Sequence, residues 1–449
     1  LRILYHFFKL LVRVGTWIYY SKITVQHGER SKISGACIVI SNHPSTVLDP
    51  LNAAVRMQRI VFFLANSGLF KNPVAGWLLN KLYCIPVERQ KDVPGRAPEN
   101  SESLERATSF LTGGGCLYIA PEGNSYVERR LRKMKTGTAR IAFAAESRND
   151  FKLGLTILPI GLNYSSPTEF RSHLLTIFGE PVQVADFQKD WETDPVEGVR
   201  KFTAYLGERL SDLLIDTLDD AEDALLNRLE VLLQNENRLP NMAHFQRTKA
   251  VQAHLQALRA SDEEAFGDFE KQVAGYFEKL EALKISDLAL ILVFRNLQDF
   301  GKLSLRLAAL FPAFLLGYAS NFLPCFFSKK INDWLNDDLS YVPTFKFLAG
   351  IVFFPIFWGL QIWLVSRLTP PLGGWGVWTW LYLASLIPSG LAAERFLKDW
   401  KLRLESRRVK FLRKEKPAEY ADLQEKRKEI LASGILNWKE TKALKSVSL

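Results

Sequence analysis

The chain has 449 residues and a net charge of +10, with 47% hydrophobic and 24% charged residues. That length allows two or three domains and a large buried core. The charge is uneven, because residues 395–449 carry 16 Lys and Arg against 8 Asp and Glu. A basic tail beside apolar segments favours anionic lipid over nucleic acid as a partner, and no nucleic-acid-binding motif is present. The sequence therefore predicts a membrane-associated protein with no nucleic-acid partner.

Cysteines and histidines predict neither disulfides nor a metal centre. Cys37, Cys84, Cys116 and Cys325 form no CxxC pair, and the first three lie in or beside apolar runs. This pattern is typical of buried free thiols in a reducing compartment. The six histidines show no metal-ligand spacing, so we expect no bound metal.

Residues 1–21 are mostly apolar, but Arg2, His6, Lys9 and Arg13 recur at intervals of four, three and four residues. On a helix these side chains form one polar stripe, which favours a helix lying in the membrane interface over one that crosses the bilayer. The alternative is a helix that packs on the core of the neighbouring domain.

Residues 22–190 alternate strand-like apolar runs with helical patterns. This alternation predicts an α/β domain with a mixed sheet flanked by helices, in which active sites lie where strands end. The expected strands are 37–41, 60–65, 116–120, 156–162 and 174–178, with helices at 70–82 and 100–111 between them.

The stretch Ser41–Pro50, SNHPSTVLDP, follows the first expected strand and carries His43 and Asp49. Imidazole titrates near neutrality and a buried carboxylate can fix its tautomer, so this pair has the parts of a general base and its orienting partner. Six residues along a straight helix turn two side chains well apart. The two can therefore meet only if the segment after Pro44 bends as a turn first. The alternative is a turn histidine with a capping aspartate.

Three further stretches lie at the ends of short apolar or strand-like runs: Ile85–Arg89 (IPVER), Tyr118–Gly123 (YIAPEG) and Leu158–Tyr164 (LPIGLNY). With the histidine stretch, their order and spacing resemble the four blocks of the glycerolipid acyltransferase family, whose members move a fatty acyl group onto glycerol phosphates. The resemblance covers roughly residues 5–185.

Membership of this family implies a role for individual residues of the four blocks. It implies that His43 and Asp49 are the catalytic pair, and that Arg89, Glu122 and Gly123 bind the acceptor. Backbone N–H groups around Gly123 are candidates for stabilising the oxyanion of the reaction.

Two departures from the usual family pattern resemble one branch of it, the enzymes that acylate glycerol 3-phosphate or dihydroxyacetone phosphate. Five residues separate His43 from Asp49, where family members usually have four. Asn124-Ser125 follows Gly123, where many members have Thr-Arg. The basic stretch after this turn is similar to the same branch.

Basic residues after the Pro-Glu-Gly turn are candidates for phosphate recognition, because guanidinium and ammonium groups form charge-assisted hydrogen bonds with phosphate oxygens. We expect Arg130, Arg132 and Lys135 to bind the acceptor. The alternative is a solvated basic loop that meets anionic lipid.

Residues 196–300 form a helical region, because leucines recur there at steps of three, four and seven residues. This spacing is typical of amphipathic helices packed on one another or on a partner. After residue 395 the pattern is that of a charged helix, and we assign 396–449 to a basic helical tail. That tail either contacts lipid or is a solvated face.

Residues 303–395 form a hydrophobic membrane region with three apolar stretches, at about 307–327, 347–366 and 376–393. The second contains no charge and is close to the ~20 residues needed to cross a bilayer. Asn321 and two prolines in the first stretch favour a re-entrant or interfacial segment there.

These patterns together predict a membrane-bound O-acyltransferase of phospholipid synthesis, with its catalytic domain facing the cytoplasm. The resemblance implies acyl-CoA or acyl carrier protein as the donor substrate and glycerol 3-phosphate or a close analogue as the acceptor, and we expect no cofactor. A lysophosphatidate (1-acylglycerol-3-phosphate) acyltransferase is the alternative enzyme. An inactive lipid-binding scaffold is the alternative from another class, and a turnover assay discriminates it from both. The oligomeric state stays open.

Overall fold

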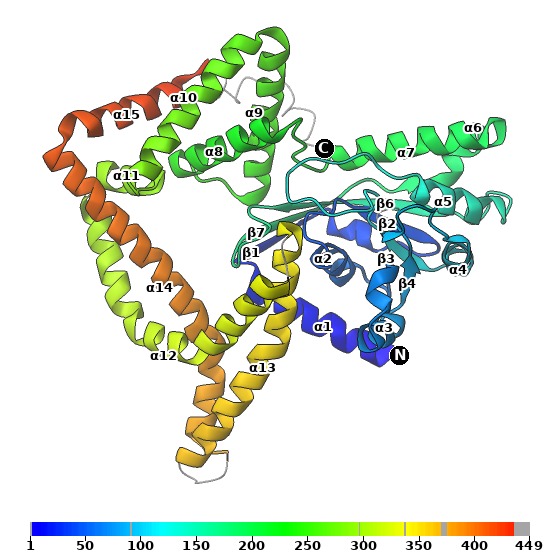
Figure 1. The fold of residues 1–449 in the computed structure, drawn as a ribbon, viewed down its shortest axis with the longest axis horizontal. Helices are drawn as coiled ribbons and strands as arrows, with labels where there is room; N and C mark the ends of the chain where they lie inside the picture. Colours follow the sequence, from blue (N-terminus) through cyan, green and yellow to red (C-terminus); the bar gives the residue numbers. More distant parts are fainter. Residues whose placement is uncertain (1, 90–91, 296, 336–337, 370–374, 435–449) are drawn as a thin grey trace. The chain divides into compact units, whose positions relative to one another are not determined.

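The computed structural model describes residues 2–89, 92–295, 297–335, 338–369 and 375–434 (Figure 1). The chain divides into two compact units. The first consists of Leu1–Leu218 with Asn336–Phe347, and the second of Asp219–Leu335 with Leu348–Leu449.

The first unit is built on one mixed sheet. Its strands are β1 (Lys22–Gln26), β2 (Cys37–Ser41), β3 (Phe62–Asn66), β4 (Cys84–Val87), β5 (Cys116–Ile119), β6 (Thr156–Tyr164), β7 (His173–Phe178) and β8 (Val182–Gln183). Their spatial order is β1-β7-β6-β2-β5-β3-β4, with β8 beside β6. Neighbours from β6 to β4 pair in parallel, whereas β7 and β8 run antiparallel to β6. The prediction of a mixed α/β sheet flanked by helices is confirmed.

Helices cover both faces of this sheet (Figure 1). They are α1 (Arg2–Tyr19), α2 (Leu48–Arg56), α3 (Pro73–Lys81), α4 (Ser101–Thr112), α5 (Gly137–Ser147), α6 (Gln188–Thr193) and α7 (Pro195–Ser211). All five residues of β2 are buried, as expected for an apolar, β-branched strand with both faces covered. Ile38 and Ile40 point into the core formed with α4, α5 and α7.

Helix α7 also belongs to this unit, although the sequence placed the end of the domain at residue 190. Its residues Phe202 and Leu206 are buried in the same core as β2. The chain after α7 then lies against β6, because a Cβ atom on Gly161 would stand only 2.3 Å from the carbonyl oxygen of Leu213. The missing side chain of Gly161 therefore permits this close approach.

The parallel strands bring the sequence motifs to one edge of the sheet. Because β2 pairs in parallel with β6 on one side and β5 on the other, the carboxyl ends of all three lie together. The expected strand 37–41 is β2, and four other expected strands match β3, β5, β6 and β7 within three residues at either end. The short strands β1, β4 and β8 were not among the expected ones.

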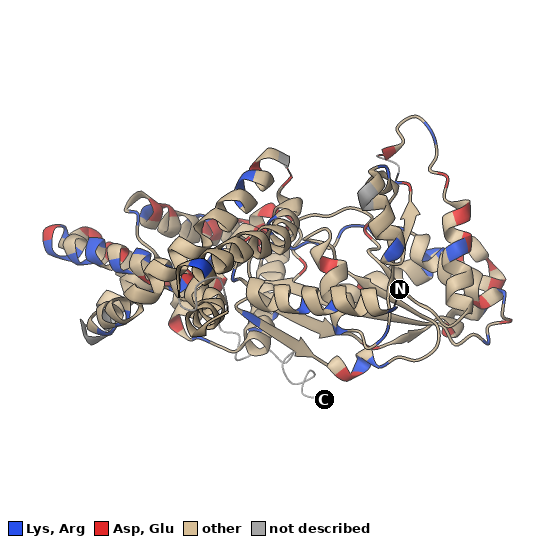
Figure 2. Cartoon of the chain, turned by 90° about the horizontal axis from the view of Figure 1, so that it is seen from below, with Lys and Arg blue, Asp and Glu red and all other residues tan. Residues whose placement is uncertain are grey.

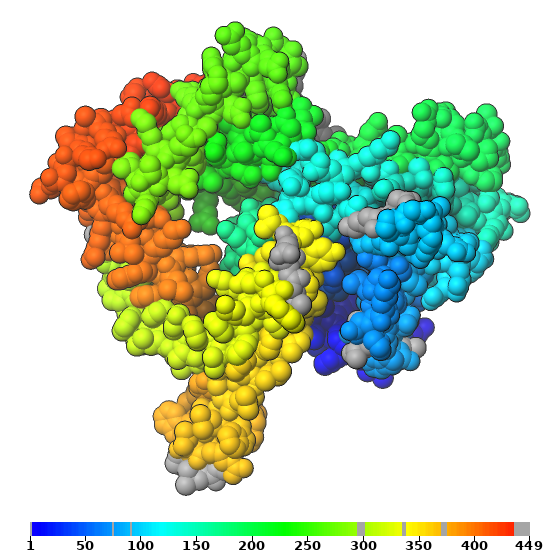
Figure 3. Space-filling model, viewed as in Figure 1, coloured from blue at the N-terminus to red at the C-terminus, as the bar shows by residue number. Residues whose placement is uncertain are grey.

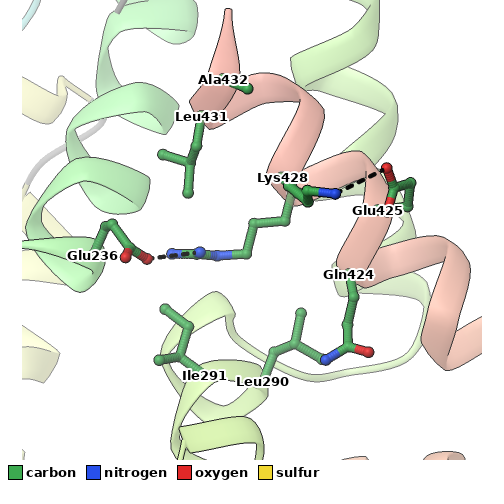
Figure 4. Close-up of a pocket in the computed structure, with 9 residues that line it drawn as sticks. Glu236, Leu290, Ile291, Gln424, Glu425, Lys428, Leu431 and Ala432 are labelled. Atoms are coloured by element: carbon green, nitrogen blue, oxygen red, sulfur yellow. Dashed lines mark hydrogen bonds and ion pairs between the residues drawn. The ribbon is translucent and has the colours of Figure 1, made fainter.

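The second unit is helical throughout its described residues. Its helices are α8 (Asp220–Glu236), α9 (Asn241–Ser261), α10 (Glu263–Ala282), α11 (Asp287–Arg295), α12 (Leu297–Leu335), α13 (Val342–Leu368, from Leu348 on), α14 (Val377–Glu415) and α15 (Pro417–Ala432). A pocket of about 490 Å³ opens between α8, α11 and α15, where Arg427 pairs with Glu236 (Figure 4). The predicted tail 396–449 is helical up to Ala432 apart from Lys416, and residues 435–449 lie outside the described part.

Two helices, over Gly301–Trp334 and Leu339–Leu368, are long and apolar enough to cross a membrane, judged by length and composition among the described residues. None of the most apolar window of the second is buried, so this segment is not a core helix. The sequence favoured a re-entrant or interfacial segment at 307–327. The re-entrant form is wrong, because α12 runs without a break through Pro312 and Pro324, whereas an interfacial helix stays a prediction. A proline inside a helix removes one hydrogen bond and bends the helix, but here it does not end it.

Candidate active site

The site begins where β2 ends at Ser41. The chain turns over residues 44–47 and enters α2 at Leu48. This turn brings the Nδ1 atom of His43 to 3.0 Å from the Oδ2 atom of Asp49. The prediction that the two side chains meet only across a turn is confirmed.

Asp49 is fully buried, and three donors hold its carboxylate in place. Besides His43, the backbone N–H of Ser45 donates to Oδ2 at 2.6 Å, and the hydroxyl of Tyr164 donates to Oδ1 at 2.7 Å. Burial raises the pKa of Tyr164 above its ordinary value, which keeps this hydroxyl protonated and able to donate. The orientation of the carboxylate is therefore fixed by groups from β6 and from the turn itself.

The imidazole of His43 is left with one nitrogen for chemistry. A carboxylate accepts a hydrogen bond, so Nδ1 carries the proton that it donates to Asp49 in the neutral ring, and Nε2 carries a lone pair. No described residue forms a hydrogen bond with Nε2, and the side chain is 18% exposed. This geometry suits a general base that can be reached from solvent.

Glu122, the acidic residue of the Pro-Glu-Gly turn, ties two parts of the site together. Its side chain is buried and accepts hydrogen bonds from two backbone N–H groups. One is that of His43, at 3.0 Å from Oε1, and the other is that of Arg132, at 2.9 Å from Oε2. The carboxylate thus links the turn after β5 to the histidine and to the basic loop.

Burial raises the pKa of Glu122 from an ordinary value of 4.5 to about 7, although the two N–H donors and His43 act in the opposite direction. Between these two values the folded protein keeps a proton that the unfolded chain has released. Folding stability therefore falls as the pH rises through this window. The contribution of Glu122 is fully present below pH 4.5 and is lost above about pH 7.

We expect the melting temperature of the wild type to fall relative to that of Glu122→Gln between pH 5.5 and pH 8, since glutamine does not titrate. The corresponding change in free energy of unfolding between pH 5.5 and pH 8 is about 2 kcal/mol. Thermal unfolding of both proteins in the same detergent measures it. The amide of the glutamine faces an N–H donor, but that cost does not vary with pH. A difference that stays constant across this pH range would show that Glu122 is ionised throughout.

The basic loop after β5 is held to the site at both ends. The backbone N–H of Tyr126 donates to the carbonyl of His43, and that of Lys135 donates to the carbonyl of Pro121. The guanidinium of Arg132 lies 4.7 Å from the centre of the Tyr126 ring and pairs weakly with Glu128 at 3.4 Å. The loop therefore carries its basic side chains beside the histidine.

Gly123 has a φ of +74°, which favours glycine, and its N–H donates to the carbonyl of Ala120. That N–H is thus engaged in the turn. The exposed side chain of Lys135 passes over this glycine, with two of its carbons 3.5 Å from the place that a Cβ atom would take. Arg130 lies in the same loop, between Arg129 and Leu131, whose backbones are bound by Thr217 and Asp216.

Arg89 follows β4, which lies three strands from β2 at the same edge of the sheet. Its guanidinium forms a bidentate pair with Asp92, at 2.7 and 3.0 Å. Among the described residues, no hydrogen bond or ion pair joins Arg89 to the histidine or to the basic loop. The structure therefore ties Glu122 and the basic loop to the histidine, whereas Arg89 lies three strands away.

Sequence reasoning missed the groups that support the pair. Tyr164 lies in the fourth motif, but nothing in the sequence tells that its hydroxyl reaches Asp49. The amide of Asn52, one turn along α2 from Asp49, donates to the hydroxyls of Tyr164 and Tyr20. An asparagine on the apolar side of a helix was the one available signal for such a buried contact.

Asn42 joins the end of β2 to β6 through its side chain. Its amide donates to the carbonyl of Leu162 at 3.0 Å and accepts from the N–H of the same residue at 2.9 Å. The residue before His43 thus continues the sheet pairing by one position beyond the strand. Among the described residues, no group of three or more His, Cys, Asp or Glu side chains is arranged to hold a metal ion.

Comparison with known proteins agrees with the motifs. A model of the family described as Acyltransferase matches residues 22–163. The chain is 29% identical over 126 residues to Glycerol-3-phosphate O-acyltransferase 2 of Saccharomyces cerevisiae, a match that covers 28% of this chain and 16% of that protein. Glycerol-3-phosphate O-acyltransferase 1 of the same yeast is 32% identical over 79 residues, covering 18% and 10%.

The 1-acyl-sn-glycerol-3-phosphate acyltransferase BAT2 of Brassica napus is 27% identical over 161 residues, covering 35% of this chain and 42% of that protein. The matched part is thus less than half the length of each of these relatives. Each of these three relatives is nevertheless named as an acyltransferase of glycerolipid substrates. Residues 22–163 therefore form an acyltransferase domain, and the named relatives that it matches are acyltransferases of glycerolipids.

Proposed function

We propose that this protein transfers a fatty acyl group from the thioester of acyl-CoA or acyl carrier protein to a hydroxyl of glycerol 3-phosphate or a close analogue. The observation that carries the proposal is the pair of His43 and buried Asp49, 3.0 Å apart, with Nε2 of the imidazole unpaired among the described residues. The names of the two yeast relatives support the acceptor.

The reaction follows from this geometry. Nε2 of His43 removes the proton of the acceptor hydroxyl, whose oxygen attacks the thioester carbonyl and forms a tetrahedral oxyanion. When this intermediate collapses, the carbon–sulfur bond breaks. The leaving thiolate takes the proton from Nε2, which restores the neutral imidazole. Asp49 stabilises the imidazolium between these two transfers and is not itself protonated. The proposed reaction needs no cofactor.

Lysophosphatidate is the second candidate acceptor, because the Brassica napus relative is named for it. A comparison of kcat/KM for glycerol 3-phosphate, dihydroxyacetone phosphate and lysophosphatidate on one purified preparation decides between them. We expect the two water-soluble acceptors to be preferred. A clear preference for lysophosphatidate would move the assignment to the second candidate, and no turnover with any acceptor would favour the scaffold.

Arg130→Ala and Arg132→Ala are expected to raise the KM for the phosphorylated acceptor about ten- to a hundredfold, since each charge-assisted hydrogen bond contributes roughly 1.5–3 kcal/mol. The KM for the acyl donor changes less. Alanine at 132 keeps the backbone bond to Glu122, so the loop stays in place. Steady-state kinetics with each substrate varied in turn measures both constants.

Lys133→Ala is the matched control for this pair of variants, because Lys133 is an exposed basic residue of the same loop with no assigned contact. We expect it to leave the acceptor KM within about twofold. The arginine variants could raise the KM values of donor and acceptor alike, or the lysine variant could raise the acceptor KM as much as they do. Either result would mean that the basic residues act through the net charge of the loop and do not bind the phosphate directly.

Membrane attachment rests on two exposed apolar rows. One face of α1 exposes Ile3, Phe7, Leu10, Val14 and Trp17, each between 43% and 87%. The helix that begins at the N mark in Figure 2 carries basic but no acidic residues. On α13, a second row exposes Leu348, Val352, Ile356, Leu360 and Leu364. Such contiguous apolar surfaces favour lipid over water.

We expect the full chain to stay with the membrane fraction in 1 M salt, because apolar burial is not screened whereas the attraction of the basic tail is. Extraction of membranes with salt and with carbonate, followed by sedimentation, is the measurement. The two candidate spans would return the chain to its starting side. With the basic tail on the cytoplasmic side, this agrees with a cytoplasmic catalytic domain. Release of the protein by salt alone would contradict membrane attachment through its helices.

A further inference from the structure

A segment almost 300 residues further along the chain packs on the catalytic turn. The first unit includes the short 3-10 helix η5 (Leu339–Tyr341) and the first turns of α13, up to Phe347. Figure 3 shows the start of α13, in yellow, beside the blue atoms of the first unit. The ring of Phe347 fills the space that a side chain on Gly15 of α1 would need. The ammonium of Lys346 donates to the carbonyl of Thr168.

The hydroxyl of Thr344 in this segment reaches the turn between His43 and Asp49. It donates to the carbonyl of Ser45 at 3.0 Å and accepts from the N–H of Val47 at 3.2 Å. It also lies 2.5 Å from the hydroxyl of Thr46. Three consecutive residues of the turn are therefore bound by one side chain.

This set of bonds uses the whole capacity of the hydroxyl. A threonine hydroxyl has one proton to donate and two lone pairs that accept. Since the proton of Thr344 goes to Ser45, the hydroxyl of Thr46 donates in the 2.5 Å contact with Thr344, and its single proton then leaves the 3.4 Å approach to the carbonyl of Ser340 as a van der Waals contact. Thr344 is 3% exposed, so water cannot take its place if the hydroxyl is removed.

The turn needs such an anchor because its backbone is strained. Thr46 has a φ of +41°, which is unfavourable for a β-branched residue and persists only where the surroundings impose it. Its side chain is 6% exposed, and its hydroxyl also lies 3.4 Å from the carbonyl of Ser340. Both contacts come from the segment that contains Thr344.

The strained turn leads directly to the catalytic pair. The peptide N–H of Ser45 donates to the same Oδ2 atom of Asp49 that accepts from His43. Ser45 is thus fixed by Thr344 through its carbonyl and by Asp49 through its N–H. A shift of the turn would move the N–H that sets the carboxylate, and with it the imidazole.

We propose that Thr344 is a positioning residue for the His43–Asp49 pair, so that the first turn of the apolar helix α13 is part of the active-site scaffold. The inference rests on the proposed acyl transfer. It implies that a candidate membrane-spanning helix and the catalytic turn are one structural element. Disturbance of α13 near its start will then reduce turnover rather than substrate binding.

Steady-state kinetics of the full-length chain in detergent tests the proposal. Thr344→Val leaves the N–H of Val47 unpaired and removes one of the two hydrogen bonds to the carbonyl of Ser45, which still accepts from the N–H of Leu48. We expect kcat to fall at least tenfold with both KM values within about twofold. Thr344→Ser keeps the hydroxyl and retains kcat within about threefold. The control is Ser366→Ala in the same helix, which we expect to keep wild-type kinetics, because among the described residues its hydroxyl bonds to the carbonyl of Trp363 alone.

If Thr344→Val does not fold, Thr344→Ser and Thr344→Cys form the second comparison. They differ in one atom, and sulfur is a poor hydrogen-bond partner. We expect the cysteine variant to have at least a fivefold lower kcat than the serine variant. Equal kcat values for these two, or wild-type turnover in Thr344→Val, would overturn the role of Thr344. Rises in KM that match the fall in kcat would overturn it too.

His43→Ala in the same assay distinguishes a failure of the positioning role of Thr344 from a failure of the proposed acyl transfer. An inactive His43→Ala beside a fully active Thr344→Val would reject the positioning role alone. Wild-type turnover in His43→Ala, or none in the wild type, would instead reject the proposed function.

Discussion

His43→Ala is expected to lower kcat by about 10³-fold, within the range of 10²–10⁴ that a general base typically contributes. Alanine removes the Nε2 atom that we propose accepts the proton of the acceptor hydroxyl, and it leaves the residues proposed to bind the acceptor in place. Neither KM should change by more than about threefold. A radiolabelled acyl-transfer assay on purified protein measures the residual rate.

The fold should survive this substitution, because the structural contacts of residue 43 are made by its backbone. Its N–H donates to Glu122 and its carbonyl accepts from Tyr126, and alanine keeps both. A melting temperature within a few degrees of the wild type is the control. Wild-type turnover in His43→Ala would falsify the assigned mechanism, whatever the acceptor.

The sequence predicted the part of the site that local chemistry determines. Strand β2 is an uninterrupted apolar, β-branched run, so its bounds could be read directly. Pro44 and the six-residue step from His43 to Asp49 required a turn, and the structure contains it. Motifs placed at the ends of parallel strands necessarily share one edge of a sheet.

The rest of the site depends on contacts between residues far apart in the chain, for which a single sequence carries no signal. Tyr164 and Thr344 reach Asp49 and its turn across 115 and nearly 300 residues. Their hydroxyls are unremarkable in the sequence because each lies within an apolar segment. Only the packing of β6 and of the start of α13 reveals where they point.

Helix α1 shows a similar limit. Its sequence predicted one polar stripe and left two alternatives, a helix in the membrane interface or a helix packed on the core. In the structure Tyr5 and Val12 are buried on the domain and Lys9 donates to the carbonyl of Met57, while Phe7 is exposed. Periodicity fixes the faces of a helix, but not which face meets the protein.

The structure also indicates how much smaller the loss of kcat should be in Asp49→Asn than in His43→Ala. An asparagine that places its carbonyl oxygen where Oδ2 lies still accepts from Ser45 and His43. Its amide then faces the hydroxyl of Tyr164, which can accept once it turns its proton away. The tautomer of His43 is therefore retained, and the substitution removes the negative charge together with the hydrogen bond that Tyr164 donates.

Loss of that charge weakens the stabilisation of the imidazolium, a charge-assisted hydrogen bond of roughly 1.5–3 kcal/mol. We therefore expect Asp49→Asn to lower kcat about ten- to a hundredfold, less than His43→Ala, with KM values unchanged. Tyr164→Phe removes one neutral donor to the same carboxylate and should cost less than tenfold. Kinetics of the three variants on one preparation gives the order His43→Ala, Asp49→Asn, Tyr164→Phe. An asparagine variant as inactive as the alanine variant would mean that the charge does more than stabilise the imidazolium. An asparagine variant with wild-type turnover would show that the negative charge of Asp49 does not contribute to catalysis.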